Sequence, residues 1–235
     1  MSGQSSPELW VERLGIVPYA PALELQRGVA RQRIDGSVPE DVLLLLEHHP
    51  VVTLGRSSKE KHLLASPELL RARGVELFEV ERGGDVTFHG EGQLVGYPII
   101  DLKRHKRDLH WYLRQVEEAL IVALASFGIE AERNPGYTGV WTRGRKIASI
   151  GVHARDWVTW HGFALNVCTD LRFFDLIVPC GIQSVTMTSV AQELGRPASV
   201  AEVSSAVADA FGTTFGLTVR EVSRFALSEF VISGA

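Results

Sequence analysis

The sequence predicts one large domain that combines α-helices with β-strands. Three observations predict it: strand-like runs flank a glycine-rich segment at residues 75–80 and 94–100, an apolar repeat at helical spacing spans residues 109–127, and short alternating segments form a meander over residues 139–168. A chain of 235 residues can bury a substantial core, as one large domain or as a domain with a small appendage.

Composition and charge exclude several classes of protein. The residues are 45% hydrophobic and 22% charged with a formal net charge of −4, which gives no argument for a nucleic-acid or membrane partner. The first ten residues lack the basic and apolar regions of a signal peptide, and no run of about 18 apolar residues could span a membrane. Two cysteines make no disulfide framework, so we expect a reduced, cytoplasmic setting.

The first part of the chain predicts two helices and two short strands. A helix over residues 22–34 is expected to be the first ordered element, and a short helix is expected over residues 66–74. Between them, residues 41–56 predict two buried strands around His48 and His49. Adjacent histidines on a strand point to opposite faces, so they form no chelating pair and we expect no metal site there.

The segment from Arg82 to Gln93, RGGDVTFHGEGQ, is the first candidate site. It places four glycines, an arginine, a histidine and a threonine in twelve residues, as a loop between two strands. Glycine lets the backbone approach a ligand closely, Arg82 offers a planar cation, and His89 is a group that titrates near neutrality. The segment fits neither the dinucleotide-binding nor the P-loop pattern, and its polar groups are too concentrated for a plain hairpin with a solvated arginine.

The clearest helix spans Leu109 to Phe127 and ends at Gly128. Its apolar residues recur on one face, so we expect it to pack on the core. Glu117 and Glu118 are expected on a solvated face and not as a catalytic pair. The apolar face consists of Leu109, Leu113, Val116, Leu120, Leu124 and Phe127.

The meander supplies a second candidate group, Lys146. Strands are expected over residues 139–144, 145–155 and 158–168, and a meander of this kind is expected to be antiparallel. Lys146 lies at the start of the second strand, where a lysine is usually a solvated charge. A functional role for it requires a partner.

A cysteine is the candidate partner. Cys180 lies between Pro179 and Gly181, which predicts an irregular turn that presents the side chain. Cys168 closes an alternating strand and is expected to behave as a small hydrophobe. An ammonium near a thiol favours the thiolate, and Lys146 could supply it. From the residues alone, an inert Cys180 and a catalytic one have equal weight.

Two capped helices and a short strand are expected after the meander. Ser189 and Ser199, each followed three residues later by a glutamine or a glutamate, have capping-box spacing and begin the two helices. A short strand is expected over residues 217–225, in a small C-terminal appendage.

Four motifs together resemble those of the octanoyltransferases of lipoate biosynthesis, also called lipoyl(octanoyl) transferases. They occur in the order found in that family and cover about residues 41–190. Glu91 stands where the family usually has proline, and residues 183–190 are variable in the family; neither difference removes a reacting group. The motifs are RGGDVTFHGEGQLVGYPIIDL (residues 82–102), GRKIASIGVHAR (144–155), HGFALNV (161–167) and PCGI (179–182).

The resemblance implies the α+β fold of biotin and lipoate protein ligases, a mixed sheet backed by helices, with a small C-terminal part at about residues 196–235. It implies an acyltransferase that moves an octanoyl group from octanoyl-acyl carrier protein to a lysine ε-amine on lipoyl domains of 2-oxoacid dehydrogenase complexes and of the glycine cleavage H protein. It also implies a monomer in the cytoplasm that needs no cofactor, no ATP and no metal, and binds no nucleic acid or membrane.

The resemblance also assigns roles to residues. Cys180 would carry the acyl group as a thioester, and Lys146 would move the protons. An ATP-dependent lipoate or biotin ligase and a non-catalytic acyl-binding protein on the same fold are the alternatives, and the presence of both residues weighs against them. The substrate-binding residues implied are Arg82, Gly83, Gly84, Asp85, Val86, Thr87, Phe88, His89, Ser149, Ile150, Gly151, Gly162, Phe163 and Ala164.

Overall fold

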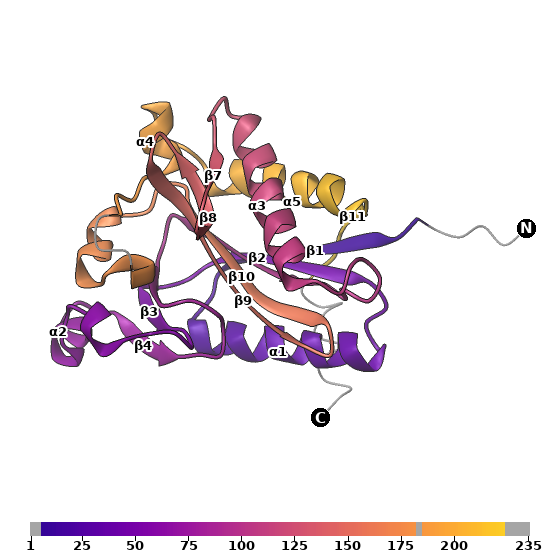
Figure 1. Cartoon of the computed structure of the whole chain (residues 1–235), viewed down its shortest axis with the longest axis horizontal. Coiled ribbons are helices and arrows are strands. Elements are labelled where there is room, and N and C mark those ends of the chain that lie inside the picture. The colour runs from indigo at the N-terminus through magenta and orange to yellow at the C-terminus, as the bar shows by residue number, and fades with distance from the viewer. Residues whose placement is uncertain (1–5, 182–184, 224–235) are drawn as a thin grey trace, which may run out of the picture.

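The structure, a computed structural model of the chain, describes residues 6–181 and 185–223, except for the side chain of Cys180. Its largest element is a mixed sheet of eight strands in the order β11-β1-β2-β6-β10-β9-β8-β7 (Figure 1). β1 pairs in parallel with β2 and β11, and the other neighbours pair antiparallel. The strands are β1 (Glu8–Ile16), β2 (Asp41–Glu47), β6 (Gln93–Ile99), β7 (Glu132–Asn134), β8 (Tyr137–Thr142), β9 (Arg145–Arg155), β10 (Val158–Asn166) and β11 (Thr218–Glu221).

A second sheet of three strands contains the glycine-rich segment. β3 (Val51–Leu54) lies in its middle, with β4 (Glu76–Glu79) parallel on one side and β5 (Val86–His89) antiparallel on the other. The expectation of a loop throughout the glycine-rich segment is therefore wrong. Its central residues form a strand because β3 pairs with their backbone groups.

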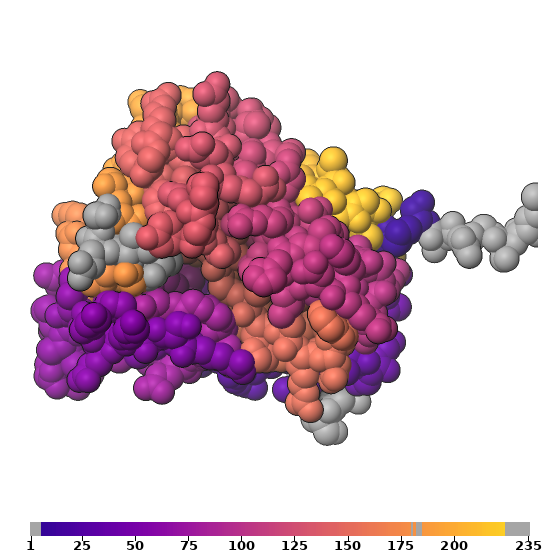
Figure 2. Space-filling view, in the orientation of Figure 1, coloured from indigo at the N-terminus to yellow at the C-terminus, as the bar shows by residue number. Residues whose placement is uncertain are grey.

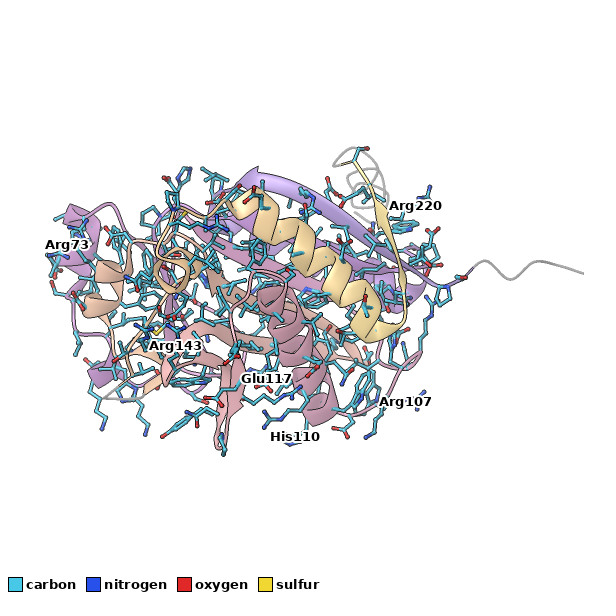
Figure 3. All side chains as sticks on the ribbon, turned by 90° about the horizontal axis from the view of Figure 1, so that it is seen from above. Arg73, Arg107, His110, Glu117, Arg143 and Arg220 are labelled. Atoms are coloured by element: carbon cyan, nitrogen blue, oxygen red, sulfur yellow. The ribbon has the colours of Figure 1, made fainter. Side chains whose placement is uncertain are left out.

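Helices cover both faces of the large sheet. α3 (Leu109–Ala125) and α5 (Val200–Phe215) lie side by side on one face, as Figure 3 shows from above, and α1 (Tyr19–Asp35) lies on the other. Along β2, residues 43 and 45 pack toward α3 and α5, whereas residues 42, 44 and 46 pack toward α1. Because successive strand residues face opposite ways, this continuous apolar run serves two cores.

Local capping sets most of the helix ends. Gly36 ends α1 in the left-handed conformation, with φ of 87°. The hydroxyls of Ser66, Ser189 and Ser199 accept hydrogen bonds from backbone amides in the first turns of the helices that follow them, as expected. The shorter elements are η1 (Glu60–His62), α2 (Pro67–Ala72), η2 (Leu171–Leu176), η3 (Pro179–Gly181) and α4 (Val190–Leu194).

The first element among the described residues is a strand and not a helix, so the expectation of a helix over residues 22–34 as the first ordered element is wrong. β1 lies inside the large sheet, between β2 and β11, and buries Leu9 and Val11. The charged pair Glu12 and Arg13 interrupts its apolar alternation, which is why the pattern is weak. Residues 196–223, the described part of the expected C-terminal appendage, pack onto the same sheet through α5 and β11.

Glu117 of α3 is buried, so its expected place on a solvated face is wrong. Its carboxylate accepts hydrogen bonds from Arg114 at 2.6 Å and from the Gly139 amide at 3.1 Å, and lies 3.2 Å from Arg133 Nε. This side of α3 packs against β8, which brings the Gly139 amide to the carboxylate, while Arg114 reaches it from α3 itself and Arg133 from β7. Glu118 remains half-exposed. Among the described helices, none is long and apolar enough to cross a membrane.

Candidate active site

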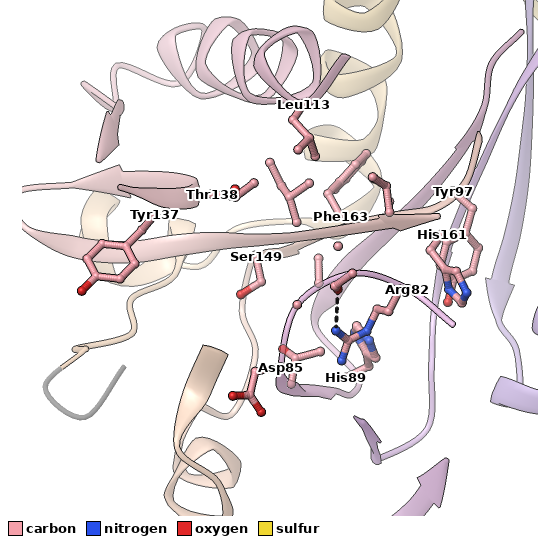
Figure 4. Close-up of a pocket in the computed structure, with 18 of the residues that line it drawn as sticks. Arg82, Asp85, His89, Tyr97, Leu113, Tyr137, Thr138, Ser149, His161 and Phe163 are labelled. Atoms are coloured by element: carbon pink, nitrogen blue, oxygen red, sulfur yellow. Dashed lines mark hydrogen bonds between the residues drawn. The ribbon is translucent and has the colours of Figure 1, made fainter. Parts of the chain in front are cut away.

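A cavity of about 400 Å³ lies between the glycine-rich segment and the large sheet. Figure 2 shows this face of the molecule, with α3 and the β8–β9 hairpin (magenta to pink) above the purple residues of η1 and α2. In Figure 4, Tyr137 and Thr138 lie toward one end of the cavity, and Tyr97 and His161 toward the other. All but two of the expected substrate-binding residues line it: Arg82, Gly83, Gly84, Asp85, Thr87, His89, Ser149, Ile150, Gly151, Gly162, Phe163 and Ala164.

The two exceptions are Val86 and Phe88. Both are buried in the cluster on the other side of β5, where the Phe88 ring stacks on Phe173 with centroids 4.7 Å apart. Strand alternation explains the difference, because Thr87 and His89 face the cavity and their neighbours must face away. The expectation that Val86 and Phe88 line the substrate pocket is therefore wrong.

Glycine lets the segment lie directly on β9. The Gly83 amide donates a hydrogen bond to the Val152 carbonyl at 2.8 Å. A Cβ on Gly151 would lie 2.7 Å from the Gly83 carbonyl oxygen, closer than real Cβ atoms come to backbone, and 3.2 Å from Arg82 Cδ. One wall of the cavity therefore depends on the missing side chain at Gly151.

Gly151→Ala is expected to reduce the acyl transfer that the family resemblance implies by about tenfold or more, since the wall must shift by a fraction of an ångström to admit the methyl group. Gly83→Ala is the matched control, because its Cβ would meet its nearest atom, the Val152 carbonyl oxygen, at an ordinary 3.4 Å. Transfer rates and melting temperatures of both variants would be compared. Equal activity in the two would contradict the role assigned to Gly151.

Arg82 holds the segment in place from inside. Its side chain is buried, with Nη2 donating to the Thr53 carbonyl at 2.7 Å and to Thr53 Oγ1 at 2.9 Å, and Nη1 donating to the Gly83 carbonyl at 3.1 Å. The alternative of a solvated arginine is wrong. Arg82 both lines the cavity and fixes the segment to β3.

Two buried histidines near the Tyr97 end of the cavity are uncharged. His48 Nδ1 lies 2.7 Å from the Val17 carbonyl, which can only accept, so Nδ1 carries the proton and Nε2 accepts from the Tyr97 hydroxyl at 2.7 Å. Burial lowers the pKa of His48 to about 4, and burial together with repulsion from His48 lowers the pKa of His89 to about 3. Both rings are therefore neutral at pH 7. His89 does not titrate near neutrality as expected, and burial is the cause.

Thr87 contributes a buried hydroxyl that has no hydrogen-bond partner within the described residues. Thr87→Val breaks no hydrogen bond to the described residues, so we expect it to change the free energy of unfolding by less than about 1 kcal/mol. Thr53, its cross-strand neighbour, is the control: its hydroxyl accepts from Arg82, so Thr53→Val should destabilise. Denaturant unfolding of both variants would test this, and an equal loss of stability in both would contradict it.

Lys146 lines the cavity and is only 1% exposed, so it is no solvated charge. Its Nζ donates to the Thr138 carbonyl at 3.3 Å and lies 5.6 Å from the centre of the Trp141 ring. Its backbone bonds to the segment just beyond PCGI: the amide donates to the Thr186 carbonyl at 2.8 Å, and the carbonyl accepts from the Thr188 amide at 2.9 Å. The structure thus places Lys146 beside the chain that follows Cys180.

Cys180 lies in the η3 turn, and its side chain and Ile182 of the same motif lie outside the described residues. The turn lies against a residue that lines the cavity. A Cβ on Gly181, where φ is 70°, would lie 2.7 Å from Asp85 Oδ2, and Asp85 is a cavity residue. An irregular turn at Pro179 to Gly181 was expected, and the structure confirms it.

The other cysteine differs from its expectation. β10 ends at Asn166, so Cys168 lies beyond the strand, where it is exposed and not packed as a hydrophobe. Its amide donates to the Gly92 carbonyl at 2.9 Å. Partial burial of the thiol, with the Glu47 carboxylate as a second cause, raises the pKa of Cys168, which disfavours its thiolate.

Sequence reasoning missed several residues of the cavity. Tyr97 and His161 stand inside two of the motifs quoted above and could have been included on that ground. Leu109 and Leu113 fall on the apolar face of α3, which made them core residues by pattern. Only the folded chain reveals the wall they form with Tyr19, Gly136, Tyr137, Thr138 and Val152.

The chain is similar to known proteins in both sequence and fold. The family model for the lipoyl protein ligase A/B catalytic domain matches residues 18–212. An octanoyltransferase from Rubrobacter xylanophilus is 53% identical over 209 residues, which are 88% of this chain and 93% of that protein. Lipoate-protein ligase A bound with ATP superposes with a TM-score of 0.78 at 18% identity, over 97% of this chain and 94% of that chain.

A bi-partite lipoate protein ligase from Thermoplasma acidophilum, described together with its E2 lipoyl domain, superposes with a TM-score of 0.77 at 17% identity, over 97% of this chain and 91% of that chain. At such low identity these structures show the fold, which confirms the expected mixed sheet of lipoate protein ligases backed by helices. By the family match and the Rubrobacter relative, the chain belongs to the lipoyl protein ligase A/B catalytic-domain family and, within it, to the octanoyltransferases, a family of acyltransferases.

Proposed function

We propose that the chain transfers an octanoyl group from acyl carrier protein to the ε-amine of a lysine on a lipoyl domain, through a thioester on Cys180. The observation that carries this proposal is that buried Lys146 lines the cavity and bonds to the chain that follows Cys180, while the Cys180 turn lies against another cavity residue, Asp85. A cavity that is largely apolar, with neutral histidines near one end, suits an acyl chain.

In the first half-reaction, the Cys180 thiolate attacks the thioester carbonyl of the donor. The tetrahedral intermediate collapses, the bond from carbon to the pantetheine sulfur breaks, and the Lys146 ammonium gives that sulfur a proton. The acyl group is then on Cys180 and Lys146 is neutral. Exchange of one thioester for another is nearly balanced in free energy.

In the second half-reaction, the neutral ε-amine of the lipoyl-domain lysine attacks the Cys180 thioester. Lys146 takes a proton from the attacking nitrogen, the bond from carbon to Cys180 sulfur breaks, and an amide forms. Conversion of a thioester to an amide is downhill, so the reaction needs no ATP. Lys146 and Cys180 return to their starting protonation states.

Binding of the acyl chain provides affinity and selectivity. Each buried methylene contributes about 0.8 kcal/mol, so eight carbons supply several kcal/mol. Backbone amides near Cys180 or around Gly151 would stabilise the oxyanion, at on the order of 3 kcal/mol per donor. The Gly181 amide already donates to the Val178 carbonyl at 3.0 Å, so an oxyanion there would have to replace that bond.

The proposal is tested by intact-mass measurement after mixing the purified chain with octanoyl-acyl carrier protein. We expect an increase by one octanoyl group, located on Cys180 by peptide mapping, and its loss when a lipoyl domain is added. The ATP-dependent alternative shares this fold. Pyrophosphate release from ATP and free octanoate, without an adduct, would contradict the proposal and support a ligase.

A further inference from the structure

Two residues that the proposed chemistry does not use form a buried pair beside the Cys180 turn. His62 of η1 and Asp85 of the glycine-rich segment meet with Nδ1 and Oδ2 only 2.5 Å apart, and their side chains are 9% and 10% exposed. Asp85 Oδ1 accepts from the Val86 amide at 2.7 Å, so both carboxylate oxygens are engaged. Because a carboxylate accepts, His62 Nδ1 carries the proton of this bond.

The pair contacts the turn directly. A Cβ on Gly181 would lie 2.7 Å from Asp85 Oδ2, and 3.0 Å and 3.2 Å from His62 Cε1 and Nδ1. The positive φ of Gly181, 70°, and the absence of a side chain there allow this close approach. The residue that follows Cys180 therefore rests on the hydrogen bond between His62 and Asp85.

The backbone around His62 holds the preceding part of the turn. The His62 carbonyl accepts from the Val178 amide at 2.7 Å, and the amides of Leu64 and Ala65 donate to the Leu176 carbonyl at 3.0 and 3.1 Å. An antiparallel bridge joins Leu63 to Ile177. Residues 62–65 thus hold the residues before the turn through backbone hydrogen bonds, and the His62 side chain contacts Gly181 at the end of the turn.

We infer that the His62–Asp85 pair is a positioning pair, which sets the Cys180 turn against the acyl cavity through the contact with Gly181. The inference rests on the proposed function for the role of Cys180. Asp85 is itself a cavity residue, so the pair ties the turn to the wall that binds the acyl chain. Displacement of a reacting atom by about 1 Å can cost about 100-fold in rate.

The test compares two replacements of His62. His62→Phe keeps a ring but loses the hydrogen bond to Asp85, whereas the side-chain amide of His62→Asn can occupy the place of Nδ1 and restore it. We expect His62→Phe to slow octanoyl adduct formation about 100-fold with little change in KM for octanoyl-acyl carrier protein, and His62→Asn to recover most of that rate. Hydrogen exchange at the amides of Val178 and Gly181 should quicken in His62→Phe and stay slow in His62→Asn.

His49 provides a matched control, since it forms an exposed pair with Glu91 at 3.1 Å and does not line the cavity. His49→Phe should leave rate and exchange unchanged. If His62→Phe does not fold, the same rate and hydrogen-exchange measurements are made on Asp85→Ala, which removes the same bond without adding volume. Native rate and exchange in the folded variant would overturn the inference, as would equal rate losses in His62→Phe and His62→Asn. Absence of any adduct on the unaltered chain would instead refute the proposed function, while hydrogen exchange would still report on the pair.

Discussion

Cys180→Ser is expected to abolish the octanoyl adduct and to lower transfer on the order of 10⁴-fold or more, as for other enzymes that lose their nucleophile. A serine hydroxyl at this position is not ionised near pH 7, so it cannot replace a thiolate. The η3 turn lies against the cavity residue Asp85, so the proposed site of acylation is next to the cavity wall. Intact-mass measurement and single-turnover transfer assays would measure both effects.

Cys168→Ser is the matched control in the same chain. Cys168 is exposed and does not line the cavity, so it lies away from a bound acyl group. Its raised pKa also disfavours the thiolate, which is the nucleophilic form. Adduct formation should persist at nearly the native rate. An octanoyl group mapped to Cys168, or an adduct that survives Cys180→Ser and disappears in Cys168→Ser, would reverse the assignment.

Much of the local structure could be predicted because it depends on residues close in sequence. The hairpin breaks expected near Arg143 and Asp156 coincide with positive φ angles of 49° and 51°, and β8, β9 and β10 pair antiparallel between them. The elements that escaped prediction depend on distant partners. β1 has a weak pattern of its own and is held by β2 and β11, which lie far away in the sequence.

The same distinction separates the site residues. The cavity residues of three motifs could be named in advance through family resemblance, since each motif keeps its own short spacing. Which side chains of β5 face the cavity could not be predicted in this way. The segment was expected to be a loop, whereas the side chains of a strand point to alternate sides. Nor could the charge of His89 be predicted, since its low pKa follows from burial by side chains that only the fold brings together.

Lys146→Met is expected to have the second large effect, and it should affect the two half-reactions differently. Methionine has nearly the same length, and its thioether can pack on the Trp141 ring where the ammonium now lies, so the fold should persist. Acylation at pH 7 should slow on the order of 10²-fold or more, because the thiol loses its ammonium partner and the leaving thiol its proton donor. Lys106→Met, at an exposed lysine that does not line the cavity, should leave both halves unchanged.

The pH dependence would identify which role of Lys146 matters in each half. A free cysteine has a pKa of about 8.5, so the Cys180 thiolate should form unaided as pH rises and acylation of Lys146→Met should partly recover. Deacylation by the lipoyl-domain lysine should remain slow, because no base replaces Lys146 there. His89 is a weak substitute, since its pKa of about 3 makes it a poor base and its Nδ1 already binds Gln93 at 2.8 Å. Rapid-quench mass measurement between pH 7 and 9 would give the rates of acylation and deacylation separately. Native rates of both half-reactions in Lys146→Met would show that another group moves the protons.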